Sequence, residues 1–159
     1  MKTKNILTLI TFILITQVAG IVGSLFTTPS IQTWFANLEK PLLNPPNWVF
    51  APVWTLLFLL MAIAAYLIYT NQNVPSKIIR KAIIIFSIQL ILNVIWSILF
   101  FGIHNPAAAF FEIIILWSTI LYTIILFYKI SRIAGWILIP YILWVSFASY
   151  LNLMLWILN

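Results

Sequence analysis

The chain has 159 residues, 64% of them hydrophobic, and carries only eight basic and two acidic side chains. Such a composition cannot cover the surface of a water-soluble domain with polar groups, so it excludes that class of protein. Cysteine is absent, which excludes disulfides, thiolate nucleophiles and Cys-ligated metals. One histidine and two glutamates, without aspartate, also exclude a hydrolytic triad and a typical metal site.

Five apolar stretches make up most of the sequence, and each is close to the ~20 residues that a helix needs to cross a bilayer. They are 5–26, 48–70, 80–101, 107–128 and 134–157. The pattern predicts an all-α integral membrane protein, a single bundle of five transmembrane helices in one domain over residues 1–159. The remaining connections leave no room for a soluble domain, so function must lie among the helices or in the longest loop.

The basic residues favour one orientation in the membrane. With the N-terminus in the cytoplasm and the C-terminus outside, only Lys40 lies outside. The other seven lie on the cytoplasmic side: Lys2, Lys4, Lys77, Arg80, Lys81, Lys129 and Arg132. This topology, together with anionic lipid headgroups, explains the positive charge, so we expect no nucleic-acid partner.

The first apolar stretch also has features of a signal peptide, because it follows lysines and contains small residues. Its apolar run extends to Phe26 and lacks a clean A-x-A cleavage site, which favours a retained helix. We expect Gly20 and Ser24, four residues apart, to form a close contact with another helix.

Polar side chains inside the spans are informative, because they must face protein, water or a ligand. Gln89, Asn93 and Ser97 are spaced four residues apart, so they form one stripe that we expect to point inward. In the fourth span, a second polar face is expected to contain Glu112, Thr119, Tyr122 and Thr123. These groups either bond to one another across helices or line a pocket.

Proline and tryptophan mark the expected pocket walls. Pro140 should break or kink the fifth span, because its ring removes a helical N–H and clashes with the preceding turn. The face that continues from it combines large aromatic residues with a small one: Pro140, Trp144, Phe147, Ala148 and Leu151. Trp54, Trp96 and Trp144 lie deep enough to stack on a flat ligand, although core packing is an equally good explanation.

The connection from Thr27 to Asn47 is the longest in the chain. Its prolines stiffen it, and its apolar residues would not remain in water: Trp34, Phe35, Leu38, Leu42 and Leu43. We therefore predict an ordered lid over the mouth of the bundle, with Trp34, Leu38, Lys40 and Pro41 as its main residues.

Several motifs resemble the translocator protein family, which comprises bacterial tryptophan-rich sensory proteins and the mitochondrial peripheral-type benzodiazepine receptor. They are WFANLEKP at 34–41, PPNWVFAPVWT at 45–55, LNVIWS at 92–97, FFGIHNP at 100–106, and PYILWVSFA at 140–148 with Leu151 and Asn152 after it. The resemblance covers nearly the whole chain, with each motif at the matching helix.

The resemblance implies a five-helix bundle, commonly a homodimer, that binds protoporphyrin IX, haem-related tetrapyrroles and isoquinoline carboxamide or benzodiazepine ligands. Position by position, the implied ligand-binding residues are Phe35, Pro45, Trp54, Asn93, Trp144, Phe147, Ala148 and Leu151. Phe35 stands where the family also has tyrosine, so it lacks a hydroxyl donor. No basic residue follows Tyr150, so the cholesterol-recognition pattern of the animal members is incomplete.

The leading hypothesis is a membrane receptor or sensor-like protein for flat hydrophobic ligands, with no required cofactor and no metal. Lys40 near the pocket mouth would attract porphyrin propionates. Two alternatives remain: a light-dependent porphyrin-degrading enzyme with Trp54 and Trp144 as catalytic residues, and a transporter of tetrapyrroles. His104 suggests a haem ligand, but a polar residue at headgroup level is the simpler explanation. We expect the bacterial plasma membrane as its location.

Overall fold

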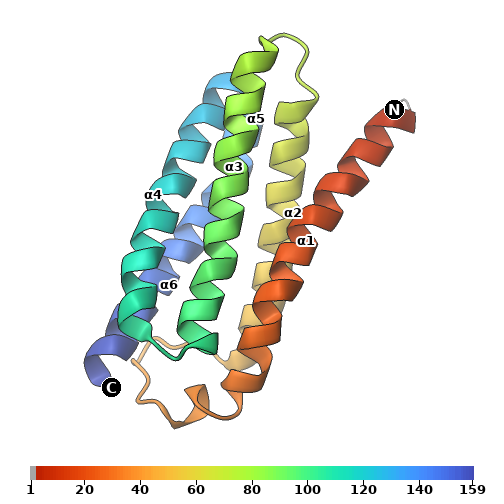
Figure 1. Cartoon of the computed structure of the whole chain (residues 1–159). Coiled ribbons are helices and arrows are strands. Elements are labelled where there is room, and N and C mark those ends of the chain that lie inside the picture. Colours follow the sequence, from red (N-terminus) through yellow and green to blue (C-terminus); the bar gives the residue numbers. More distant parts are fainter. Residues whose placement is uncertain (1–2) are drawn as a thin grey trace.

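The computed structural model describes residues 3–159, which form an elongated bundle of helices without any strand (Figure 1). The helices that cross the bundle are α1 (Thr3–Ile31), α2 (Phe50–Tyr69), α3 (Ser76–Ser97), α4 (Pro106–Ile130), and α5 (Arg132–Ile137) with α6 (Ile139–Leu158). Five helical segments of the described chain are long and apolar enough to span a membrane, which confirms the predicted fold class. Lys2 lies outside the described residues, and so does the side chain of Lys4.

Helix boundaries differ from the sequence prediction at several places, and α3 begins four residues before the predicted start, at Ser76. Helix α1 continues through Pro29 to Ile31, so the next connection begins five residues later than expected. Helix α3 is extended by one π-helical turn, η3 (Ile98–Gly102). The break predicted near Pro140 occurs at Leu138, between α5 and α6, so Pro140 lies in the first turn of α6, where its missing N–H costs little.

The two ends of the bundle have different connections. One end, called here the loop end, carries residues 32–49 between α1 and α2, the turn between η3 and α4, and the C-terminus (Figure 1). We call residues 32–49 the cap segment; it contains the short helices η1 (Phe35–Asn37) and η2 (Asn47–Val49). The opposite end, the basic end, carries the N-terminus and the connections that come after α2 and α4 (Figure 1).

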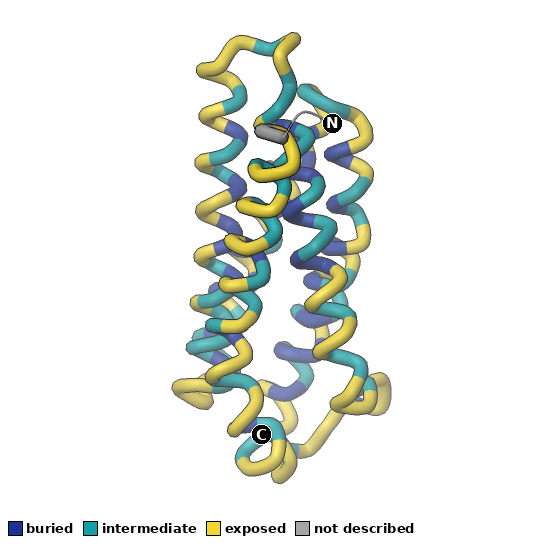
Figure 2. The backbone as a smooth tube through the Cα atoms, turned by 90° about the vertical axis from the view of Figure 1, so that its right-hand side faces the viewer, coloured by how far each residue is buried: buried dark blue, intermediate teal, exposed yellow. Residues whose placement is uncertain are grey.

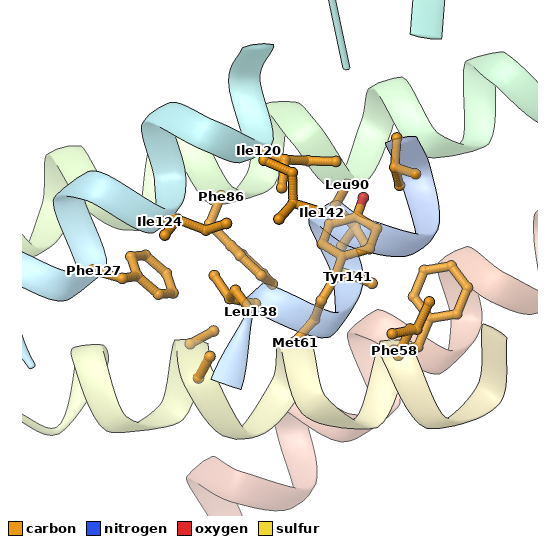
Figure 3. Packing of buried hydrophobic residues seen from close by; sticks show 14 of the residues in the cluster. Phe58, Met61, Phe86, Leu90, Ile120, Ile124, Phe127, Leu138, Tyr141 and Ile142 are labelled. Carbon is orange, nitrogen blue, oxygen red and sulfur yellow. The ribbon is translucent and has the colours of Figure 1, made fainter. Parts of the chain in front are cut away.

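A large part of the buried apolar core lies in the half of the bundle nearer the basic end. Figure 3 shows side chains from α2, α3, α4 and α6 interlocking there, among them Met61, Phe86, Phe127 and Leu138, each at most 2% exposed. Buried positions line the inner faces of the helices, and exposed positions face outward (Figure 2). The outward face is largely apolar, as a lipid-facing surface must be.

Helix α1 packs on the rim of the bundle against α2 and α3, and leans away towards its N-terminus (Figure 1). Two glycines permit the close approach. A Cβ on Gly20 would lie 2.7 Å from the Phe58 ring, and one on Gly23 would lie 3.0 Å from Ser97 Oγ. The close contact predicted at Gly20 is therefore confirmed, but its partner position is Gly23, because Ser24 is exposed.

Candidate ligand-binding cavity

A cavity of about 280 Å³ lies below the cap segment, in the half of the bundle nearer the loop end. Helices α1, α2, α3 and α6 form its walls. Aromatic rings provide much of the lining: Phe35, Phe50, Trp54, Phe58, Trp96, Phe100, Phe101 and Trp144. Its polar lining comes from neutral side chains: Gln17, Ser24, Thr27, Thr28, Asn44, Asn47, Thr55, Asn93, Ser97 and Asn152.

Six of the eight sequence-predicted ligand residues line this cavity: Phe35, Trp54, Asn93, Trp144, Ala148 and Leu151. Pro45 is not among the lining residues, and its neighbour Asn44 takes that place. Phe147 and Pro140 lie elsewhere, because they border an apolar groove between α2 and α6 on the other side of Trp144. The predicted pocket wall on α6 therefore divides between two faces of the helix.

Two buried polar atoms of the lining have no hydrogen-bond partner among the described residues. They are Nε1 of Trp144, a donor, and Oδ1 of Asn44, an acceptor. A buried donor or acceptor without a partner costs about 1–3 kcal/mol, and most such groups in native proteins are satisfied. Trp144 and Asn44 are therefore the two cavity-lining residues that each keep a buried polar atom without a partner.

No charged residue is among the described residues that line the cavity. Lys40 was expected near the mouth, and it lies on the cap segment. Its Nζ donates to the carbonyl oxygens of Ala36 and Leu38, at 3.1 and 3.3 Å, and sits 5.1 Å from the centre of the Phe35 ring. Phe35 thus separates the ammonium group from the cavity.

The inward stripe predicted on α3 is confirmed at Gln89 and Asn93, which are buried. Asn93 Nδ2 donates to the hydroxyl oxygen of Tyr141 at 3.1 Å, and that hydroxyl donates to Gln89 Oε1 at 2.8 Å. Gln89 Nε2 in turn lies 3.7 Å from the sulfur of Met61. This network forms the polar floor between the cavity and the apolar core. The spacing on α3 indicates only part of it, because Tyr141 belongs to another helix.

Asn152 joins three helical segments, a role that no spacing in the sequence indicates. Its Oδ1 accepts from Trp96 Nε1 at 3.0 Å, and its Nδ2 donates to the carbonyl of Pro106 at 2.7 Å. Both Asn152 and Trp96 line the cavity. An asparagine amide can use its donor and acceptor ends at once, so this one side chain fixes the distance between α3, α4 and α6.

The cap segment and the adjoining end of α1 are attached to the turn before α4, the first by an aromatic contact and the second by hydrogen bonds. The rings of Trp34 and His104 stack with their centres 4.4 Å apart. Ser30 Oγ donates to the carbonyl of Phe101 at 2.6 Å and lies 3.2 Å from His104 Nε2. Since the single Ser30 proton is already engaged, His104 Nε2 must be the donor in the second bond. His104 has a φ of 57°, so a strained backbone holds the ring in this place.

A second attachment joins the cap segment to the end of α6. Asn159 Nδ2 donates to the carbonyl of Glu39 at 3.1 Å, and the Glu39 N–H donates to Asn159 Oδ1 at 2.9 Å. The cap segment, predicted from the sequence as an ordered lid, is therefore attached both to the turn before α4 and to the end of α6. Phe35 and Pro41 are buried, but Leu42 and Leu43 are 100% and 60% exposed, so the expectation that they leave water by packing on the bundle was wrong.

The polar face predicted on α4 is only partly correct. Glu112 and Thr123 are buried, whereas Tyr122 is exposed. Neither carboxyl oxygen of Glu112 has a hydrogen-bond partner among the described residues. Glu112 does not line the cavity, and no group of three or more His, Cys, Asp and Glu side chains lies together in residues 3–159.

Comparison with known proteins identifies the family. The model of the TspO/MBR family matches residues 12–157. The chain belongs to this family. It is 43% identical to the tryptophan-rich protein TspO of Archaeoglobus fulgidus over 98% of this chain and 99% of that protein. It is 41% identical to the protein of the same name from Chlorobaculum tepidum over 98% of both chains. The human translocator protein is 30% identical over 91% of this chain and 86% of that protein.

Family membership confirms the resemblance seen in the motifs and agrees with an integral membrane protein related to the tryptophan-rich sensory and translocator proteins. The matched region extends from α1 to the last turns of α6, so it includes every helix that lines the cavity. The ligand roles of the individual side chains stay predictions, which depend on the geometry of the cavity.

Proposed function

We propose that the chain is a receptor or sensor-like membrane protein that binds flat, largely apolar ring systems in the cavity. The proposed ligands are tetrapyrroles such as protoporphyrin IX, and carboxamides of the isoquinoline or benzodiazepine type. One observation supports this best: an aromatic lining with one unpaired donor, Trp144 Nε1, and one unpaired acceptor, Asn44 Oδ1. A ligand carbonyl would accept from Trp144, and a ligand N–H would donate to Asn44.

Cavity size separates the two ligand classes. At about 280 Å³ the cavity is slightly smaller than the range for drug-sized ligands, about 300–1,000 Å³. A carboxamide on a two-ring system suits this space, whereas a tetrapyrrole macrocycle requires the cap segment to lift. Lifting Phe35 would also expose Lys40, whose ammonium group could then meet a propionate. The proposal includes no cofactor, since the porphyrin enters as a ligand.

The test is equilibrium binding of a radiolabelled isoquinoline carboxamide to the purified protein in detergent. Ala148→Leu should weaken binding strongly, because the larger side chain takes up part of the cavity. Trp144→Phe should weaken it about tenfold, the effect of one lost hydrogen bond to a buried donor. Phe147→Leu is the matched control on the same helix, since Phe147 borders the groove instead of the cavity. Equal losses in all three variants would contradict the assignment of the cavity.

A second function, light-dependent porphyrin degradation, is favoured by the position of Trp54 and Trp144, which line the same cavity from α2 and α6. An excited porphyrin held between them could be oxidised with dioxygen as the oxidant. Illuminating the complex and monitoring loss of porphyrin absorbance tests this function. Turnover that persists in the Trp54→Phe, Trp144→Phe double variant would show that the protein only binds the pigment.

We also propose that the N-terminus faces the cytoplasm of a prokaryotic plasma membrane and that the protein is a homodimer. Lys77, Arg80, Lys81 and Lys129 are exposed near the basic end, which fits the cytoplasmic side. Because the chain has no cysteine, single cysteines at Ser76 and Asn37 can report the orientation. In intact cells an impermeant maleimide should label the cysteine at position 37 and leave that at position 76 unlabelled. The reverse pattern would contradict the orientation.

A further inference from the structure

The lipid-facing surface between α3 and α4 carries two rows of exposed side chains that the cavity does not explain. In each row the residues are seven apart, close to two helical turns, so they stay on one face of their helix. The row on α3 is Lys81, Ile88 and Ile95, and the row on α4 is Lys129, Tyr122 and Ile115.

A direct contact joins the two rows. Lys81 Nζ lies 5.7 Å from the centre of the Tyr122 ring, so the two rows meet where α3 packs against α4. This strip of surface along the α3–α4 contact is called here the furrow. The two helices are consecutive along the chain and run in opposite directions. Lys129 is therefore beyond Tyr122 towards the basic end, and Ile88 and Ile115, 43% and 57% exposed, lie deeper in the membrane.

The positive charge of this furrow has no counter-charge nearby. The two acidic residues of the chain are Glu39, on the cap segment, and Glu112, in the α4 turns nearer the loop end. Lys77, four residues before Lys81, adds a third ammonium group on the same face of α3. Lysine side chains can extend along the helix so that their charged ends reach the headgroup region.

We propose that this furrow binds one anionic phospholipid. The phosphate lies between the ammonium groups of Lys81 and Lys129, Tyr122 supports the glycerol region, and an acyl chain runs over the isoleucines deeper in the furrow. The positive charge of the lysines favours an anionic lipid as the bound partner over a second copy of the chain. A two-fold dimer across this face would bring equal rows of lysines together, which is repulsive.

The test measures the affinity of the purified protein for phosphatidylglycerol and for phosphatidylcholine by native mass spectrometry from a non-ionic detergent. The test variant carries Lys81→Gln and Lys129→Gln. The matched control carries Arg80→Gln and Arg132→Gln, with the same change in net charge. Successive residues of a helix are about 100° apart around its axis. Arg80 and Ala82 therefore lie on nearly opposite sides of α3, and since Ala82 is buried, Arg80 points outward and away from the furrow. Arg132 belongs to α5, outside both rows.

We expect the lysine variant to lose about tenfold to thirtyfold in affinity for phosphatidylglycerol, and the arginine variant to keep it within about twofold. Binding of phosphatidylcholine should be unchanged in both. Equal losses in the two variants would mean general attraction by net charge and would overturn the site. Displacement of the lipid by millimolar inorganic phosphate would overturn the assignment to a lipid, and dimer loss in the lysine variant would indicate a protein interface instead.

Discussion

The two halves of the bundle are held together in different ways. Near the basic end, apolar side chains interlock: the Phe86 and Phe127 rings stack with centres 5.9 Å apart, and both are nearly fully buried. Near the loop end, polar side chains connect the helices by bonds to distant groups, as Asn152, Ser30 and Asn159 do. The cavity lies in this second half.

The difference reflects the separate requirements of the two halves. In a membrane, apolar helix faces gain little by leaving lipid, so tight side-chain packing supplies much of the stability. A half that keeps a cavity gives up part of that packing. Single polar contacts can hold its walls at fixed distances without filling the space between them. We therefore expect stability to depend most on the basic-end half and ligand binding to depend most on the loop-end half.

The largest effect on stability is expected for Phe86→Ala in the basic-end core. Deleting a buried phenyl ring leaves a cavity and costs about 3–5 kcal/mol of unfolding free energy. The change should lower the thermal unfolding midpoint in detergent, while ligand affinity below that midpoint stays the same. Phe86→Leu is the control with a smaller loss of volume. A large loss of affinity in either variant would show that the two halves are coupled.

Asn152→Leu should come next, because it acts on the loop-end half. It leaves Trp96 Nε1 and the Pro106 carbonyl without their partners, which we expect to cost about 2–3 kcal/mol. Unlike the core change, it should also weaken ligand binding, since Trp96 lines the cavity. Parallel measurement of the unfolding midpoint and of carboxamide affinity distinguishes the two cases. Unchanged affinity would show that Trp96 keeps its position without this bond.

Sequence periodicity predicted the fold and the parts of the cavity wall on α3 and α6 for one physical reason. In lipid, a polar or small residue on an apolar helix has few permitted environments, so the spacing of Gln89 and Asn93 reveals the inward face. The same reasoning located Trp54, Trp144 and Ala148, which depend only on the face of a single helix.

Contacts between segments far apart in the chain were not predictable in this way. Asn152, His104 and Asn159 act through backbone carbonyls or ring faces of other elements, and such partners leave no periodic pattern in the sequence. The position of Phe147 beside the groove instead of the cavity was not predictable for a related reason. Phe147 is three residues after Trp144, which borders both the cavity and the groove between α2 and α6. Two neighbours on one helix face can therefore border different ones.

Whereas Phe86→Ala and Asn152→Leu should lower the free energy of unfolding, Glu112→Met should raise it by a smaller amount. The carboxyl group is buried, and neither oxygen has a hydrogen-bond partner among the described residues. Replacing an unsatisfied polar group with an apolar one of similar length removes its desolvation cost, so stability should rise by about 1–2 kcal/mol. Thermal unfolding measures it, with Glu112→Gln as the control that keeps a polar group. A lower midpoint for the methionine variant would reveal an interaction that the carboxyl group makes.

The smallest effect concerns the cap segment, and it tests whether the loop-end half closes over its ligand. Trp34→Ala removes the stack on His104 but no residue of the cavity lining, so it should loosen the cap without changing the site itself. Affinity differences between related complexes arise mostly from dissociation, so we expect a rise of about threefold to tenfold in the porphyrin dissociation rate and little change in association. Trp48→Ala is the matched control, because Trp48 belongs to the same segment and is 74% exposed. Stopped-flow displacement of protoporphyrin IX measures both rates. Equal rates in the two variants would show that the segment is a fixed structural cover instead of a lid.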